Sequence, residues 1–127
     1  MNSDNIIQMG GSEWWGDYIF IVTAGGNSLM KIYFDKRFKE GCCEFGELNT
    51  HPDFRRQGFA KRLMQEAEKV ARSKGYEEAW LWTKSSSWQQ KWYERMGYKV
   101  ETAVRPPSSD TIWLSKALDY ERENSDY

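Results

Sequence analysis

Apolar and polar positions divide the first half of the chain into three strands. Residues 17–23 and 29–34 are rich in β-branched and aromatic side chains, and the turn-forming residues 24–27 between them predict a hairpin. A third strand is predicted over 42–50. It ends before Pro52, which cannot donate a hydrogen bond to a sheet ladder.

A helical period begins at Phe59 and predicts one long helix. Apolar side chains recur on a single face, at Phe59, Leu63, Ala67, Val70 and Ala71. Gly75 is placed to end this helix, and the short apolar run 79–83 after it is typical of a strand covered on both faces. Residues 42–83 therefore predict a strand-helix-strand unit with a right-handed crossover.

The last third of the chain predicts a second helix and two more strands. Serines at 85–87 offer N-caps for a helix that ends at Gly97, and strands are predicted over 98–104 and 111–118. The predicted fold class is thus α/β (α+β), with a mixed central sheet of about six strands and two main helices.

At 127 residues the chain is expected to form a single domain over 1–127. The ends, residues 1–16 and 119–127, carry little pattern and are predicted to be flexible. No apolar run is long enough to predict a membrane span, and no targeting signal is visible, so we expect a cytoplasmic protein.

Charge and composition narrow the function classes. The net charge is −1, which provides no global field to recruit nucleic acid or membrane. One histidine and two adjacent cysteines predict no metal site. Cys42 and Cys43 should point to opposite faces of their strand and remain free, buried thiols. Seven tryptophans indicate an aromatic core or a flat aromatic face.

The turn from Arg55 to Ala60 joins the third strand to the long helix and is a candidate anion site. The first amides of a helix have no intrahelical partner, and the helix dipole adds about half a positive charge there. Gly58 allows the backbone to come close to a ligand, and Arg55, Arg56 and Lys61 add local positive charge. The turn therefore predicts a cradle for phosphates.

The pattern Arg55-x-x-Gly58-x-Ala60 resembles the pyrophosphate signature of the GNAT family of N-acetyltransferases. The stretch from Leu48 to Arg56 and the box from Trp92 to Tyr98 resemble two further family segments in the same order. The resemblance implies a GNAT-like fold and acetyl-CoA as co-substrate. The coenzyme-binding residues that it implies in the turn are Arg55, Arg56, Gln57, Gly58, Phe59, Ala60 and Lys61.

The resemblance also implies that the two central parallel strands splay apart near Leu48, Asn49 and Thr50. The exposed backbone there would pair with the pantetheine arm, and one amide would polarise the thioester carbonyl. Ser86 stands where the family often has an asparagine that contacts this arm.

Three side chains are candidates for catalysis. Tyr93 matches the family tyrosine that protonates the departing thiolate. An amine acceptor must first lose a proton, and either Glu44 or Glu47 could accept it, with Glu44 favoured by the resemblance. In a regular strand these two glutamates would face opposite ways, unless a bulge intervenes.

The family fold opens with a strand and two helices, but only about 16 residues precede the first hairpin here. The N-terminal helices should therefore be shortened or missing. This leaves an open acceptor groove or one completed by a second subunit in a homodimer. The predicted function is acetyl transfer to a primary amine, of a small molecule or a protein. The alternatives are a non-catalytic CoA- or protein-binding module and an RNA- or phosphate-binding protein, the latter disfavoured by the net charge.

Overall fold

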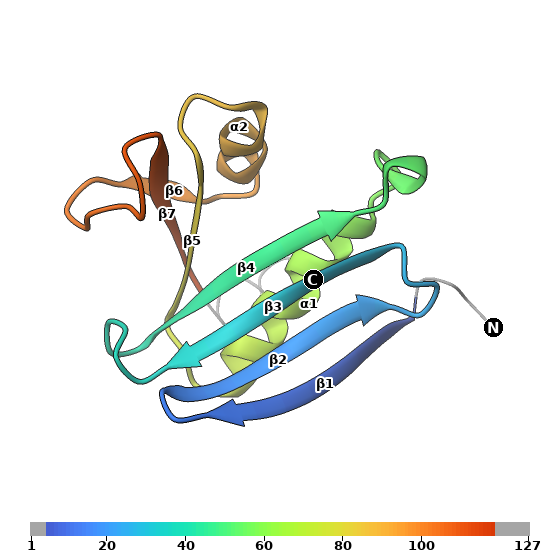
Figure 1. The fold of residues 1–127 in the computed structure, drawn as a ribbon, viewed down its shortest axis with the longest axis horizontal. Coiled ribbons are helices and arrows are strands. Elements are labelled where there is room, and N and C mark those ends of the chain that lie inside the picture. Colours follow the sequence, from blue (N-terminus) through green and yellow to red (C-terminus); the bar gives the residue numbers. More distant parts are fainter. Residues whose placement is uncertain (1–4, 119–127) are drawn as a thin grey trace, which may run out of the picture.

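A computed structural model describes residues 5–118, so the predicted flexible end at 119–127 lies outside the described residues. They form one seven-stranded sheet of order β1-β2-β3-β4-β5-β7-β6, with β4 and β5 parallel and the other neighbours antiparallel (Figure 1). The elements are β1 (Ile6–Glu13), β2 (Gly16–Thr23), β3 (Ser28–Asp35), β4 (Cys42–Thr50), the 3₁₀ turn η1 (Pro52–Phe54), α1 (Phe59–Ser73), β5 (Glu78–Lys84), α2 (Trp88–Arg95), β6 (Lys99–Glu101) and β7 (Thr111–Ala117).

Strand β1 corrects the expectation of a flexible N-terminal end for the described residues 5–16, and it gives the sheet seven strands where about six were expected. It pairs with β2 along its whole length. Its strand signal is weak because Gly10 and Gly11 interrupt the alternation of side chains. Gly11 is required by packing, since the Tyr18 ring lies over it and a Cβ there would be 2.4 Å from ring atoms. The pairing of β1 therefore depends on packing against β2, which the local pattern of β1 does not reveal.

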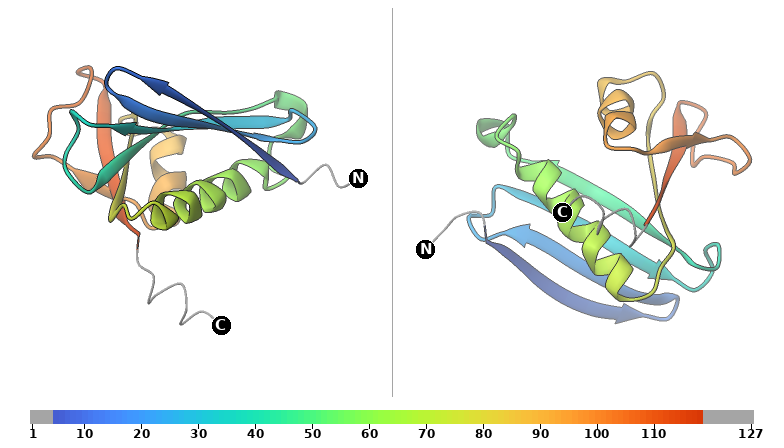
Figure 2. Two further views of the ribbon diagram at one scale, coloured as in Figure 1. Left: turned by 90° about the horizontal axis from the view of Figure 1, so that it is seen from below. Right: turned by 180° about the vertical axis from the view of Figure 1, so that it is seen from behind.

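The two faces of the sheet are covered differently. Helix α1 packs on β2, β3 and β4 from one side, and Figure 2 shows no helix on the other side of these strands within residues 5–118. No helix precedes the β2–β3 hairpin in the described residues, as the short N-terminal segment predicted. One broad face of the sheet is consequently open.

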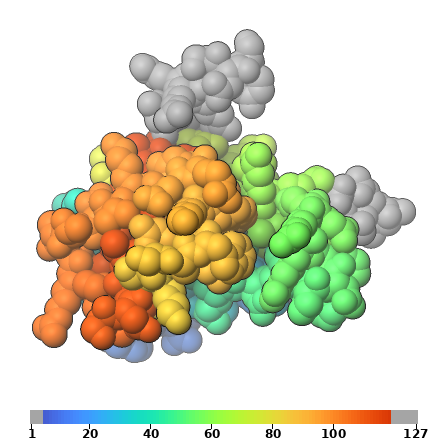
Figure 3. Space-filling view, turned by 90° about the horizontal axis from the view of Figure 1, so that it is seen from above, coloured from blue at the N-terminus to red at the C-terminus, as the bar shows by residue number. Residues whose placement is uncertain are grey.

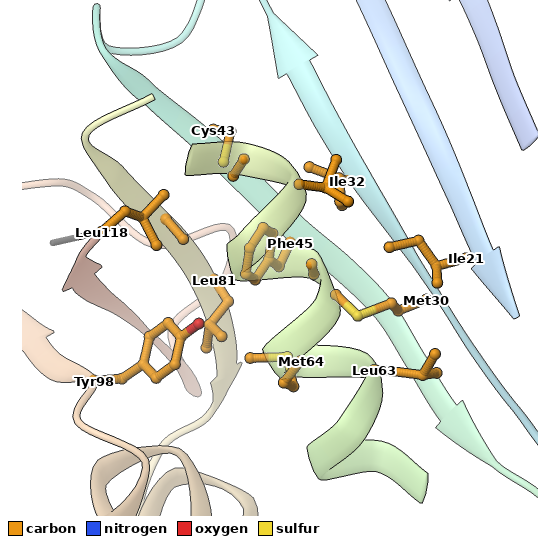
Figure 4. Packing of buried hydrophobic residues seen from close by; sticks show 14 of the residues in the cluster. Ile21, Met30, Ile32, Cys43, Phe45, Leu63, Met64, Leu81, Tyr98 and Leu118 are labelled. Atoms are coloured by element: carbon orange, nitrogen blue, oxygen red, sulfur yellow. The ribbon is translucent and has the colours of Figure 1, made fainter. Parts of the chain in front are cut away.

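The main core lies between α1 and the sheet. The apolar stripe predicted for the long helix is confirmed, because all five of its members are buried. Figure 4 shows Leu63 and Met64 of α1 packed near Met30, Phe45 and other side chains of the strands. Gly75 follows the helix with a φ of +88°, in the left-handed region that favours glycine.

A smaller aromatic cluster lies on the opposite face of the sheet. Trp80 and Trp113 pack edge to face at 6.0 Å between ring centroids, and Phe38 and Cys42 complete the group. Cys43 belongs to the main core instead. The prediction that the two cysteines are free, buried and on opposite faces is thereby confirmed.

A buried ionic contact joins α1 to the C-terminal strands. Glu68 accepts a hydrogen bond from the Tyr98 hydroxyl at 2.8 Å, and the Lys116 ammonium lies 3.0 Å from Glu68 Oε1. Burial beside this carboxylate raises the pKa of Tyr98 well above its usual value. Because all three groups sit at the junction of β6, β7 and α1, the contact fixes the C-terminal part of the sheet against the core.

Glu68→Ala is expected to lower the free energy of unfolding by about 2–4 kcal/mol, because it leaves the partly buried Lys116 without its partner. Urea denaturation measures this change. Glu66→Ala, on the same helix at a less buried position, is the matched control and should cost less than about 1 kcal/mol. Equal losses in the two variants would show that the ionic contact adds nothing beyond helix propensity.

Candidate functional site

The site is organised by the divergence of the two parallel strands. β4 and β5 pair only over Cys42–Glu44 and Glu78–Trp80, although β4 continues to Thr50 and β5 to Lys84. Figure 1 shows the two strands separating into a V, with the η1 turn at the end of β4 and α2 beyond the end of β5. The splay expected from the family resemblance is present, and it begins at Glu44, earlier than the predicted 48–50.

A cavity of about 380 Å³ occupies the opening of the V. β4 contributes residues 44–48, β5 contributes 81–84, α2 contributes Gln89 and Tyr93, and α1 contributes Met64. In the space-filling view of Figure 3, the yellow and orange atoms of β5 and α2 lie opposite the green atoms around the end of β4. The cavity therefore separates the two arms at the end where the anion-binding turn was predicted.

The cavity has an apolar and a polar side. Met30, Phe45 and Leu81 line it and belong to the main core, on the side of the sheet that α1 covers. Tyr33 and Glu44, which also line the cavity, are cross-strand partners on the open side. A molecule that spans the V would thus meet hydrocarbon on one side and ionisable groups on the other.

A β-bulge brings Glu47 to the same side as Glu44. Between the pairs Leu29–Asn49 and Lys31–Gly46, β4 contains one residue more than β3, and Glu47 has a φ of +55°. The Tyr33 hydroxyl donates a hydrogen bond to Glu47, whose carboxylate also lies 3.4 Å from the Lys31 ammonium. The two glutamates therefore do not face opposite ways, as a regular strand would require, and both line the cavity.

The two carboxylates differ in their surroundings. Burial raises the pKa of Glu44, an effect increased by the charge of Asp35 and reduced by a hydrogen bond from Trp82. Glu47 has a side chain that is 55% exposed, and the hydrogen bond from Tyr33 is the main cause that lowers its pKa. Glu44 is accordingly the better proton acceptor, and Glu47 stays ionised over a wider pH range.

Tyr93 faces the cavity from helix α2. Ser87 caps this helix by accepting a hydrogen bond from the Gln90 amide at 3.1 Å, and the Tyr93 ring packs on Trp92 and Tyr98 with centroids 5.1 and 6.0 Å away. Burial raises the pKa of Tyr93 to about 12. Its hydroxyl is therefore protonated at neutral pH and available as a donor.

The predicted anion-binding turn has the required backbone shape. Gly58 is the N-cap of α1 with a φ of +84°, and the space that its Cβ would occupy is open to 4 Å. The Arg62 amide donates to the Gly58 carbonyl at 3.0 Å, so the amides of Phe59 to Lys61 precede this first helical bond. These amides offer hydrogen-bond donors and the helix dipole adds positive charge, a combination that suits a phosphate group.

The side chains of the turn stabilise its backbone and give it positive charge. Arg55 donates to the Thr50 carbonyl at 3.2 Å, and Gln57 donates to the Asp53 carbonyl at 3.3 Å. Arg56 and Lys61 are exposed. Phe59 is buried and packs edge to face on Phe54, which anchors the turn to its helix. The turn is therefore stabilised by its own hydrogen bonds and aromatic contact, while its solvent-exposed side is basic.

Some predicted site residues do not line the cavity. Asn49 and Thr50 pair with β3, and Ser86 is exposed in the β5–α2 turn, where its amide donates to the Gln90 side chain at 2.8 Å. Gln89, one turn before Tyr93 on the same helix face, lines the cavity instead. Its spacing of four residues from Tyr93 is the signal that could have identified it.

Within residues 5–118, no group of three or more His, Cys, Asp or Glu side chains is arranged to hold a metal ion. None of the helices described there has the length and apolar character needed to cross a membrane.

Comparisons with known proteins agree with this geometry. The sequence profile of the acetyltransferase (GNAT) domain matches residues 15–100. The fold is similar to that of a proposed acyl-CoA N-acyltransferase from Klebsiella pneumoniae, with a TM-score of 0.66, 22% identity, and coverage of 81% of this chain and 72% of that one.

Two further solved structures share the fold. One is the PaiA N-acetyltransferase of Thermoplasma acidophilum in complex with coenzyme A, with a TM-score of 0.62, 20% identity, and coverage of 79% of this chain and 59% of that one. The other is the ribosomal-protein-S18-alanine N-acetyltransferase of Escherichia coli, with a TM-score of 0.61, 15% identity, and coverage of 80% and 68%. No curated protein matches the chain closely enough to count as a relative.

Proposed function

This chain belongs to the GNAT acetyltransferase family, and on that premise we propose that it transfers an acetyl group from acetyl-CoA to a primary amine by direct attack. Membership makes it an acyl-CoA-dependent N-acyltransferase. The observation that carries the finer proposal is the V between β4 and β5. It holds a cavity with a half-buried tyrosine on one arm and a half-buried carboxylate on the other.

Two features of the backbone support the proposed position of the coenzyme. The amides at the start of α1 and the left-handed Gly58 are suited to the pyrophosphate, with Arg56 and Lys61 close enough in sequence to neutralise its charge. Beyond Glu44 the edge of β4 that faces β5 has no ladder partner in β5, so the pantetheine arm can pair with it as a substitute strand. The Thermoplasma protein, which has the same fold, was solved in complex with coenzyme A, and this supports a CoA-based co-substrate.

The reaction needs a base and an acid on opposite sides of the thioester. A lysine-like amine of pKa about 10.4 is neutral in only about 0.04% of molecules at pH 7. Glu44 accepts the ammonium proton, the freed nitrogen attacks the carbonyl carbon, and the carbon–sulfur bond breaks. The departing thiolate takes a proton from the Tyr93 hydroxyl, and the tyrosinate is reprotonated by the proton that the attacking nitrogen loses as it becomes the amide. The products are the amide and coenzyme A, with no acyl-enzyme intermediate.

Tyr93→Phe is expected to lower turnover about 100-fold, because the thiolate then leaves without a proton donor. Steady-state release of free thiol from acetyl-CoA measures the change. Trp92→Phe, next to it on the same helix, is the control for altered aromatic packing and should keep most of the turnover. If Tyr93→Phe turns over as fast as this control, the hydroxyl contributes packing and no proton.

The proposal as a whole is tested by thiol release from acetyl-CoA with a panel of primary amines. Amine-dependent release supports it. Tight binding of coenzyme A with no release for any amine would favour the alternative, a binding module that has kept the fold and lost the reaction. That the acceptor groove is completed by a second subunit in a homodimer stays a prediction.

A further inference from the structure

Helix α2 carries the proposed acid, yet every one of its residues is at least partly exposed. The helix lies beyond the end of β5, on one arm of the V (Figure 1). The proposed phosphate cradle at Gly58 lies at the start of α1, on the other arm. A proton donor at Tyr93 therefore reaches the thioester only if a contact fixes α2 relative to α1.

The C-terminal end of α2 is a Schellman motif that joins Tyr93 to Tyr98. The Tyr98 amide donates to the Tyr93 carbonyl at 3.1 Å, and the Gly97 amide donates to the Glu94 carbonyl at 3.0 Å. Gly97 has a φ of +98°, the left-handed conformation that this motif uses. The rings of the two tyrosines pack with their centroids 6.0 Å apart. Both the backbone and the ring of Tyr98 thus hold Tyr93.

The hydroxyl of Tyr98 is fixed to α1. Tyr98 is 2% exposed, and its hydroxyl donates to Glu68 Oε2 at 2.8 Å, directed toward the helix as Figure 4 shows. The Lys116 ammonium holds Glu68 in turn, 3.0 Å from Oε1, and lies 5.6 Å from the centroid of the Tyr98 ring. A buried hydroxyl with a charged acceptor is confined to one orientation, whereas a ring without the hydroxyl is placed by packing alone.

We infer that Tyr98 is a positioning residue, which transmits the position of α1, the helix of the coenzyme cradle, to the proton donor Tyr93. This inference rests on the proposed function. Tyr93 lines the cavity, whereas Tyr98 lies behind it in the main core and acts through its neighbour. Displacement of a catalytic group by about 1 Å can lower a rate about 100-fold. Loss of the Tyr98 hydroxyl should therefore reduce turnover and leave coenzyme affinity nearly unchanged.

The test is steady-state thiol release by Tyr98→Phe, which keeps the ring and removes the hydroxyl. Turnover should fall about ten-fold or more, while KM for acetyl-CoA stays within about two-fold of the parent value. In a Tyr93→Phe background the same substitution should add little, because the two residues act as a unit. Tyr76→Phe, in a tyrosine that packs on Phe34, is the matched control and should leave turnover unchanged in both backgrounds.

Glu68→Gln separates positioning from a contribution to stability. Either the oxygen or the nitrogen of the new amide can form a hydrogen bond with the Tyr98 hydroxyl, but the Lys116 ammonium loses its ion pair. This variant should lose stability in urea and keep most of its turnover. Tyr98→Phe should show the reverse order, with the larger loss in turnover and the smaller loss in stability.

No loss of turnover in Tyr98→Phe, or an equal loss with and without the Tyr93 hydroxyl, would overturn the inference. NMR of the protein with isotope-labelled tyrosine gives a readout that needs no turnover. The Tyr93 ring signal should shift or broaden in Tyr98→Phe and stay unchanged in Tyr76→Phe. If no amine releases thiol, the proposed function falls, and this signal decides the inference by itself: a Tyr93 signal that is unchanged in Tyr98→Phe overturns it, and a changed one supports it.

Discussion

Gly58→Val is expected to weaken acetyl-CoA binding at least about 100-fold, because several charge-assisted contacts to the pyrophosphate are lost together. The new side chain would project from the left-handed N-cap into the space in front of the first amides of α1, which is open to 4 Å. A phosphate group has to occupy that space to reach those amides. Calorimetric titration with acetyl-CoA measures the loss.

The same helix supplies a control for the strain that this substitution introduces. Gly75, beyond the C-terminal end of α1, has a φ of +88°, compared with +84° for Gly58, and is equally open. A β-branched residue in this conformation costs about 1–2 kcal/mol at either position. Gly75→Val should therefore lose similar stability and keep full coenzyme affinity. If both variants bind alike, the phosphate cradle is not at Gly58.

The helices and most strands could be predicted because their signals are local. The stripe on α1 depends on side chains one turn apart, and a glycine follows each helix in the left-handed region, Gly75 after α1 and Gly97 after α2. β1 could not be predicted in this way. Its two central glycines are poor strand formers, and one of them, Gly11, is suited to its position by the Tyr18 ring on the next strand.

The residues of the candidate site likewise differ in whether a local sequence signal predicts them. The turn around Gly58 and the position of Tyr93 follow from short motifs, so the sequence could indicate both. The orientation of Glu47 depends on which β4 residue is left out of the ladder with β3, and that is a property of two strands together. Gly46 is the local sign of this bulge, since a Cβ there would lie 3.0 Å from the Tyr33 ring. Without the partner strand, the alternation of side chains gave opposite faces for the two glutamates.

Glu44→Gln is expected to lower turnover with an amine about 100- to 1,000-fold at neutral pH, since general base catalysis typically contributes that much. The parent protein should lose activity as the pH falls through the pKa of Glu44, which burial raises above its usual value. In the variant this acidic limb of the pH profile should disappear. Glu47→Gln should retain the limb; its loss there would identify Glu47 as the base.

The same substitution should make the protein more stable, which separates a base from a structural carboxylate. A carboxyl group whose pKa is raised by folding contributes stability that is fully present below its unfolded pKa and is lost as the pH rises through the folded pKa. Once Glu44 ionises, the parent protein therefore carries a half-buried charge that glutamine does not. Thermal unfolding should show a higher midpoint for Glu44→Gln at pH 7, with the difference vanishing in acid. A lower midpoint at pH 7 would mean that the carboxylate holds the strands together.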